Sequence, residues 1–161
     1  MSSDRFLRRT ALLGFLALAG CGFAPVYGNG GGPRGLFTYQ TPDTVAGYRL
    51  RAQLEQRLGM PANPRYALAV TLSESSQPAA INATGDTTRY NVIGRANWAL
   101  KDAVSGEEVD AGTVETFTSY AATGSTVATQ AASEDATARL SVALADMITG
   151  RVLMLAPGLQ R

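Results

Sequence analysis

The sequence predicts an α/β sandwich of the α+β kind, in which two helices pack on one face of a small, mostly antiparallel four-stranded sheet. Three patterns predict it: leucines at a spacing of four near residue 50, two-residue alternation through 66–72 and 88–101, and an apolar stripe at helical spacing near the C-terminus. The expected order of elements is strand, helix, three strands, helix. Two helices over one sheet face is the simplest packing that buries all of these apolar residues.

The first strand is expected at residues 23–27, which are apolar and contain a proline of the kind that a sheet edge tolerates. The following helix is capped by Asp43 or Thr44 and runs to Leu58, where the leucine spacing ends. Gly59 stands where the glycine after a helix usually lies. The charged residues between the leucines predict a solvated outer face for this helix.

Three strands are expected between the two helices. Residues 66–72 alternate as a half-buried strand does, and the polar residues 73–87 are expected to form a long connection. Residues 88–101 form the clearest strand of the chain. Residues 108–120 then return as an antiparallel strand with imperfect alternation, for which Gly112 is the candidate bulge.

The last helix is expected over residues 127–155. Its apolar stripe is typical of core packing and not of a cofactor site, and Gly150 is expected to weaken or end the helix. The stripe consists of Ala136, Leu140, Ala143, Leu144, Met147, Ile148 and Leu155.

One face of the strand at 88–101 is basic. Successive side chains of a strand point to opposite faces, so Arg89, Arg95 and Lys101 line up on one side. With both helices on the other face, this side of the sheet is partly open. The alternative to a binding role is an ordinary solvated face, whose cations pair with acids of the neighbouring strand. Those acids are Glu108, Asp110 and Glu115.

The N-terminus has the order of a lipoprotein signal peptide. Three arginines precede an apolar run at 11–19, which leads through two small residues to Cys21, the only cysteine of the chain. The run is too short to cross a bilayer, which takes roughly 20 residues, and it fits a signal peptide. We therefore expect residues 1–20 to be removed and Cys21 to carry a diacylglycerol and an N-acyl lipid. The alternative is a buried free cysteine after an ordinary signal peptide.

Two further features near the leader concern export and destination. Arg8 and Arg9 are similar to a twin-arginine signal, which leaves the Sec and twin-arginine routes both open. Gly22 stands where an aspartate retains many lipoproteins in the inner membrane, so the outer membrane is favoured. Two or more acyl chains would hold residues 21–161, as a single periplasm-facing domain, firmly to that membrane.

Composition excludes several classes of function. Removing 20 of the 161 residues leaves 141, which carry 11 of the 14 basic and 12 of the 13 acidic side chains. Such a nearly neutral domain lacks the basic excess that nucleic-acid binding needs. The chain has no histidine, which removes the commonest general base and the usual zinc ligand. No cofactor is expected beyond the lipid on Cys21.

These features together resemble the lipopolysaccharide-assembly lipoprotein family LptE, in its alphaproteobacterial form. The resemblance covers essentially the whole mature chain and rests on the order and spacing of four short motifs and an alanine-rich last helix. The motifs are Cys21-Gly22-Phe23 with Pro25 and Tyr27, Gly85-Asp86-Thr87-Thr88-Arg89-Tyr90, Ser105-Gly106 and Thr118-Ser119-Tyr120.

The resemblance implies a small α/β sandwich tethered to the periplasmic side of the outer membrane. It further implies a large β-barrel partner, LptD, whose lumen the domain plugs and whose assembly it assists. The complex inserts lipopolysaccharide into the outer leaflet, and members of the family are not enzymes. Basic residues near the start of the long strand bind lipid A in the family. Arg89 falls there, and the strand geometry extends the candidate lipopolysaccharide site to Arg95 and Lys101.

Two other functions remain open at the level of the sequence. The same fold and anchor would serve an accessory lipoprotein of another envelope complex, whose cations meet a protein rim. A periplasmic enzyme is disfavoured, because no histidine exists to activate a serine and no metal cluster stands out. The acids at 107–110 have the position of solvated charges beside a turn.

Overall fold

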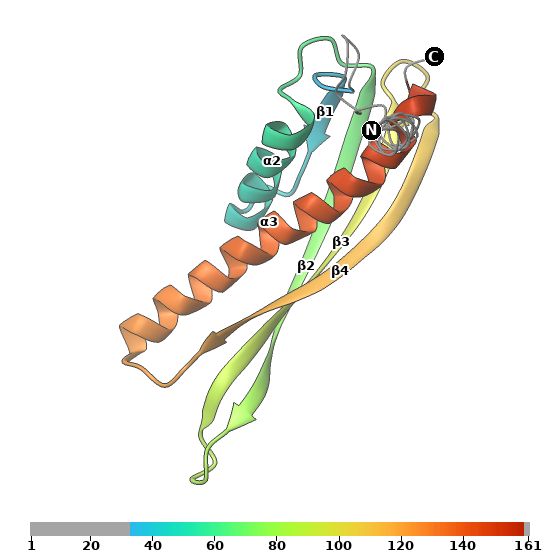
Figure 1. Cartoon of the computed structure of the whole chain (residues 1–161). Coiled ribbons are helices and arrows are strands. Elements are labelled where there is room, and N and C mark those ends of the chain that lie inside the picture. Colours follow the sequence, from blue (N-terminus) through green and yellow to red (C-terminus); the bar gives the residue numbers. More distant parts are fainter. Residues whose placement is uncertain (1–32, 160–161) are drawn as a thin grey trace, which may run out of the picture. The chain divides into compact units, whose positions relative to one another are not determined.

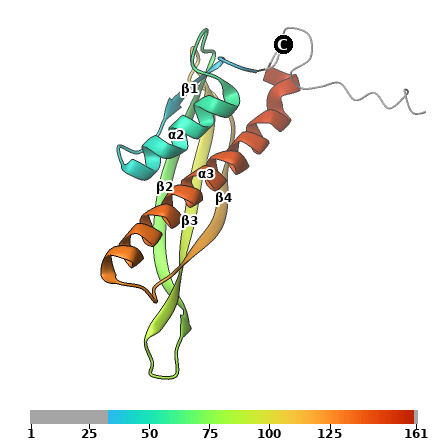
Figure 2. The same cartoon turned by 60° about the vertical axis from the view of Figure 1, so that its left-hand side comes forward.

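The computed structural model describes residues 33–159. The predicted signal peptide, Cys21 and the strand expected at 23–27 lie outside these residues. The described chain contains β1 (Phe37–Gln40), α2 (Val45–Leu58), β2 (Tyr66–Ile81), β3 (Thr87–Asp102), β4 (Glu108–Ala121) and α3 (Thr126–Leu159) (Figure 1). The predicted fold class is confirmed, because both helices lie on the same face of a four-stranded sheet (Figure 2).

The strands lie in the order β1-β2-β3-β4, with β1 parallel to β2 and the other two pairs antiparallel. The sheet is therefore mixed and mostly antiparallel. The sequence analysis did not predict β1, since four residues are too few to show an alternation. Phe37 and Tyr39 of this strand are nevertheless buried in the core.

β2 extends to Ile81, so the prediction of a long connection over residues 73–87 is wrong. Every residue from Ser73 to Ile81 is exposed. Because both faces of this segment meet water, no apolar alternation marks it in the sequence. The tip of the β2–β3 hairpin projects beyond the ends of both helices (Figure 1).

The predicted bounds of α2 are confirmed, and Thr44 is its cap. The Thr44 hydroxyl oxygen accepts the N–H of Gly47 at 3.1 Å, as an N-cap does. Gly59 follows the helix with φ +90° and donates its N–H to the carbonyl oxygen of Glu55 at 2.8 Å. The three leucines at a spacing of four are fully buried, as the pattern predicted.

α3 begins one residue before its predicted start and runs on to Leu159. Gly150 is exposed inside it and does not end it. By length and composition alone, α3 qualifies as a membrane-crossing helix. Its buried residues belong to the same core as those of the strands, so in this domain it is a core helix.

α3 approaches the sheet closely at Gly94 of β3. A methyl group at this glycine would lie 2.8 Å from Cδ2 of Leu140 and 3.0 Å from Cδ1 of Leu144. Further along β3, Trp98 is buried and packs over Gly112 of β4. Gly112 is thus a contact surface and not the predicted bulge, since the register of β3 and β4 shifts between Leu100 and Lys101 instead.

Two glycines within the helices differ in the space around them and allow a matched test of the described packing. A methyl group at Gly47 would lie 2.1 Å from the carbonyl oxygen of Pro42, whereas one at Gly150 would meet nothing within 4 Å. We expect Gly47→Ala to lower the free energy of unfolding by about 1–3 kcal/mol through overpacking. Gly150→Ala should raise it by about 0.5–1 kcal/mol through helix propensity. Urea unfolding of the full-length protein measures both, and an unchanged midpoint for Gly47→Ala would contradict the described turn between β1 and α2.

Candidate functional site

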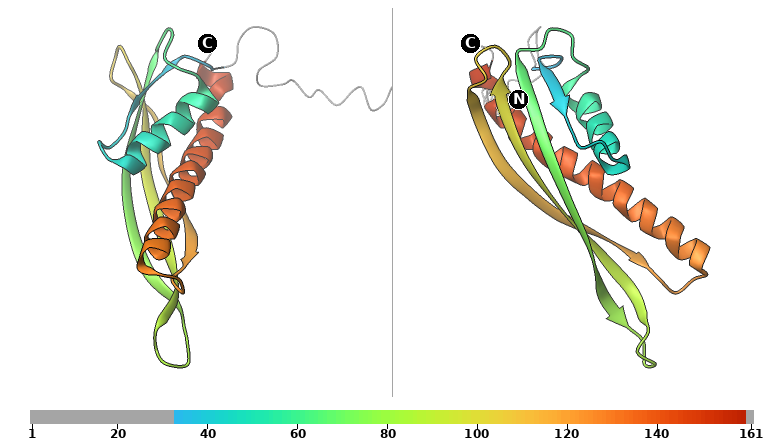
Figure 3. Two further views of the ribbon diagram at one scale, coloured as in Figure 1. Left: turned by 90° about the vertical axis from the view of Figure 1, so that its left-hand side faces the viewer. Right: turned by 180° about the vertical axis from the view of Figure 1, so that it is seen from behind.

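The sheet face turned away from the helices is the candidate functional site. None of the helices and strands within residues 33–159 covers it (Figure 3). Its side chains are mostly small or uncharged and polar, because the buried apolar residues of each strand point to the helices. Examples from the three long strands are Thr71 and Ser73, Asn91 and Asn97, and Thr113 and Ser119.

The three predicted cations all lie exposed on this face, but they do not converge. Arg89, Arg95 and Lys101 are six residues apart along β3. At about 3.3 Å per residue, neighbouring cations are separated by about 20 Å and the outer two by about 40 Å. They therefore form a stripe along the sheet, and no single small ligand contacts all three.

Polar contacts with β4 engage part of the stripe. Arg95 forms an ion pair with Glu115 directly across the strands, with an Nη2–Oε2 distance of 2.7 Å. Arg89 donates a long hydrogen bond of 3.4 Å to the hydroxyl of Ser119. Lys101 is opposite Glu108 in the register of the two strands. Arg95 thus fits the alternative of an ordinary solvated face, whose cations pair with acids of the neighbouring strand. Arg89 and Lys101, at the two ends of the stripe, are more available to a ligand.

An apolar pair interrupts the stripe, and the sequence analysis did not single it out. Phe117 of β4 is 62% exposed and lies directly across from Ile93 of β3. The pair is next to the Arg95–Glu115 ion pair along the same face. The sequence contained one sign of this pair: Phe117 is three residues from the buried Val114, so the two side chains point to opposite faces of the strand. Cations beside exposed apolar groups are the chemistry that an anionic amphiphile recognises.

The tip of the β2–β3 hairpin is held by its own side chains. The Asn82 side-chain oxygen accepts the N–H groups of Thr84 and Asp86 at 3.0 and 2.8 Å. Hydrogen bonds from Asn82 and Thr84 lower the pKa of the Asp86 carboxyl. Gly85 occupies a positive φ of 90°, which glycine adopts readily. The Gly85–Tyr90 motif therefore begins in a fixed turn and not in a loose loop.

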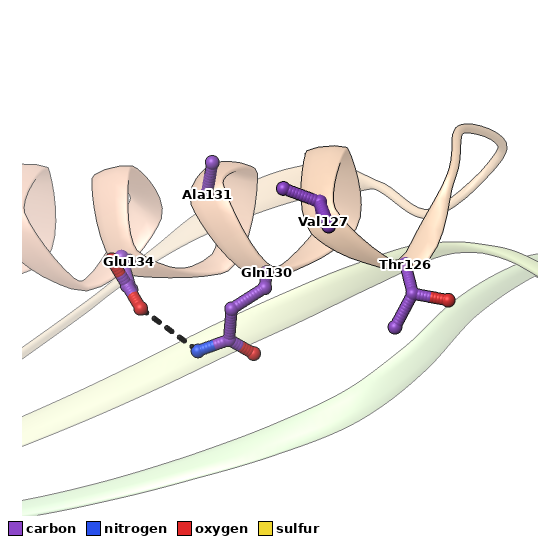
Figure 4. Close-up of a pocket in the computed structure, with 5 residues that line it drawn as sticks. All are labelled: Thr126, Val127, Gln130, Ala131 and Glu134. Atoms are coloured by element: carbon purple, nitrogen blue, oxygen red, sulfur yellow. Dashed lines mark hydrogen bonds between the residues drawn. The ribbon is translucent and has the colours of Figure 1, made fainter.

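Shallow depressions gather around the first turns of the two helices. The one in Figure 4 is lined by five side chains of α3 alone, and Gln130 donates to Glu134 at 2.9 Å within it. It is a surface depression of one helix and holds no convergent polar groups. Another, of about 400 Å³, lies between the start of α2, β2 and α3, and includes Glu74. Desolvation raises the pKa of the Glu74 carboxyl.

Residues 33–159 contain no group of three or more histidine, cysteine, aspartate or glutamate side chains able to hold a metal ion. The acids at 107–110 follow the turn between β3 and β4 and are mostly exposed. The candidate site is a largely polar sheet face with a widely spaced cationic stripe and one apolar pair.

Several solved bacterial lipoproteins have a similar fold. A putative lipoprotein from Caulobacter crescentus superposes with a TM-score of 0.61 at 26% identity, over 77% of this chain and 94% of that one. Rare lipoprotein B from Shewanella oneidensis gives 0.59 at 17% identity, over 78% and 98%. A minor lipoprotein from Acinetobacter baumannii gives 0.54 at 18% identity, over 73% and 90%.

The family model for lipopolysaccharide-assembly LptE matches residues 36–152. The chain belongs to the LptE family of lipopolysaccharide-assembly lipoproteins, and the resemblance found in the sequence is confirmed. No curated protein sequence gives a significant match.

Proposed function

We propose that this protein is an outer-membrane lipoprotein that plugs an LptD-type β-barrel, assists the assembly of that barrel and binds lipopolysaccharide during its insertion into the outer leaflet. The match to the lipopolysaccharide-assembly family over residues 36–152 is the observation that carries the proposal. The open sheet face gives it a physical basis. The protein acts by binding and not by catalysis.

The dimensions of the described domain suit the lumen of a large barrel. The 16 residues of β3 span about 50 Å, and four strands at about 4.8 Å spacing span about 14 Å. Barrels of 22 strands enclose a lumen wide enough for a folded plug, and the inner wall of such a barrel is polar. A sheet face of small polar side chains is complementary to that wall.

The lipid on Cys21 would confine the plug to the membrane in which the barrel is assembled. Tethering raises the effective concentration of one partner near the other without any new contact. Two or more acyl chains provide a stable anchor, whereas one chain binds reversibly. The anchor is thus part of the proposed mechanism.

Cys21→Ala tests the anchor. We expect the variant to remain an unlipidated precursor that does not incorporate radiolabelled palmitate, because the acylated sulfur is gone. Cys21→Ser retains the size of the side chain but not the sulfur, and it should fail equally, because acylation requires the thiol. Palmitate labelling of Cys21→Ala at the level of the wild type would show that Cys21 is not the lipidated residue.

The cationic stripe would bind the phosphates of lipid A, and the Phe117–Ile93 pair would lie against its apolar portion. Arginine and lysine bind phosphate through charge-assisted hydrogen bonds, which are roughly twice as strong as neutral ones. The separation of about 20 Å between cations means that each contacts a different phosphate group or a different lipid molecule.

The combined change of Arg89, Arg95 and Lys101 to serine tests this site. We expect lipopolysaccharide binding to weaken about tenfold or more, because several charge-assisted contacts are lost together. The melting temperature should change little, since all three side chains are exposed.

The matched control changes Arg51, Arg139 and Arg151 to serine, which removes the same charge from exposed positions on the helices. This control should bind lipopolysaccharide as the wild type does. Equal binding by both triple variants, or an equal loss in both, would show that the sheet stripe has no specific part in recognition.

A further inference from the structure

β2 has a free edge beyond the point at which β1 ends. The register of β1 with β2 stops at Gln40 and Ala69, whereas β2 continues to Ile81. After Gln40 the chain turns away into α2, and no other strand of residues 33–159 lies beside this part of β2 (Figure 1). An unpaired strand edge is a template for another strand.

The backbone groups on this edge follow from the register. The N–H of Tyr66 donates to the carbonyl oxygen of Leu36 at 3.0 Å, so the backbone of Tyr66 faces the β1 side. Every second residue of a strand faces the same neighbour, which places the N–H and C=O groups of Leu72, Glu74 and Ser76 on the free edge. Pro78 has no N–H, and the register with β3 shifts just beyond it, so the edge ends there.

The two long free edges of the sheet differ in charge. β4, at the other side of the sheet, carries Glu108, Asp110 and Glu115. Charged residues of this kind protect a natural edge strand from pairing. The free segment of β2 carries one charge, on Glu74. It is thus the less protected of the two edges.

The depression of about 400 Å³ described above forms a groove on the helix side of the same edge. Leu72 and Glu74 of β2 line it together with Val45 at the start of α2 and Thr137 of α3. Val45 is 67% exposed, so the groove has an uncovered apolar wall. No hydrogen bond or ion pair to another described residue engages the Glu74 carboxylate. A side chain projecting from a strand on the free edge would enter this groove.

We propose that the edge Leu72–Ser76 accepts an added β-strand from a partner protein, an extended segment with a β-branched apolar residue for the groove and a lysine or arginine for Glu74. Edge and groove supply the two parts of such recognition: backbone hydrogen bonds provide affinity, and pockets for alternate side chains provide specificity. The proposal goes beyond the proposed function and requires neither lipopolysaccharide nor a barrel.

The probe is a fluorescently labelled peptide, acetyl-Thr-Val-Thr-Lys-Thr-amide, whose valine and lysine point to the same face of an extended strand, together with the same peptide carrying glutamine for lysine. Fluorescence anisotropy with the full-length protein in detergent measures its affinity. Amide hydrogen exchange of the complex locates it. Bound peptide should slow exchange at Leu72, Glu74 and Ser76, whose N–H groups gain partners.

Three variants make the test specific. Ser76→Pro removes an outward N–H without breaking a bond to β3, and should weaken binding about tenfold or more. Thr113→Pro is the matched control on the outer edge of β4, and should leave binding unchanged. Glu74→Gln should weaken the lysine peptide about twofold to fivefold, as loss of an exposed ion pair does, and leave the glutamine peptide unchanged. This last comparison keeps the test decisive even where Ser76→Pro does not fold.

Three outcomes would overturn the proposal. One is the absence of saturable binding of either peptide at concentrations up to about 1 mM. Another is equal binding by Ser76→Pro and Thr113→Pro with both folded. The third is a dimer of the full-length protein in sedimentation that Ser76→Pro abolishes, because the occupant of the edge would then be a second copy of this chain.

Discussion

The fold depends on the close approach of α3 to the sheet at Gly94. A methyl group at this position would crowd the side chains of Leu140 and Leu144. From this crossing point, α3 covers β3 and β4, and α2 packs beside α3 above the β1 side of the sheet. The buried apolar side chains of the strands are thereby directed to one face, and Phe117 and Ile93 lie on the other. That other face is left polar and open, and this division makes it available for binding.

The sequence predicted the elements that contribute most to the core. α2 and β3 show clear periods because one side of each is buried, and Thr44 and Gly59 mark the ends of α2 as caps do. β1 was missed because it is only four residues long, and the outer half of β2 was missed because both of its faces meet water. The three cations were placed on the correct face by alternation alone. The ion pair of Arg95 with Glu115 and the position of Phe117 across from Ile93 depend on the register of β3 with β4, which a single sequence does not contain.

These features give the family assignment a physical meaning in this chain. Lipopolysaccharide is an anionic amphiphile, and the open face offers separated cations around an apolar pair. The free edge of β2 lies at the border of the helix layer, and it presents backbone groups together with a carboxylate. We thus propose two independent means of recognition in one small domain, one for charge and apolar surface and one for an extended chain.

The central claim is that this LptE-family protein works in a complex with a lipopolysaccharide-export barrel. Affinity purification of the tagged full-length protein from detergent-solubilised membranes of its source organism, followed by quantitative mass spectrometry, tests it most directly. The account predicts a large outer-membrane β-barrel of the lipopolysaccharide-export type in near-equimolar amount, which is absent from the untagged control. Recovery of a different envelope complex, or of no barrel at all, would contradict it.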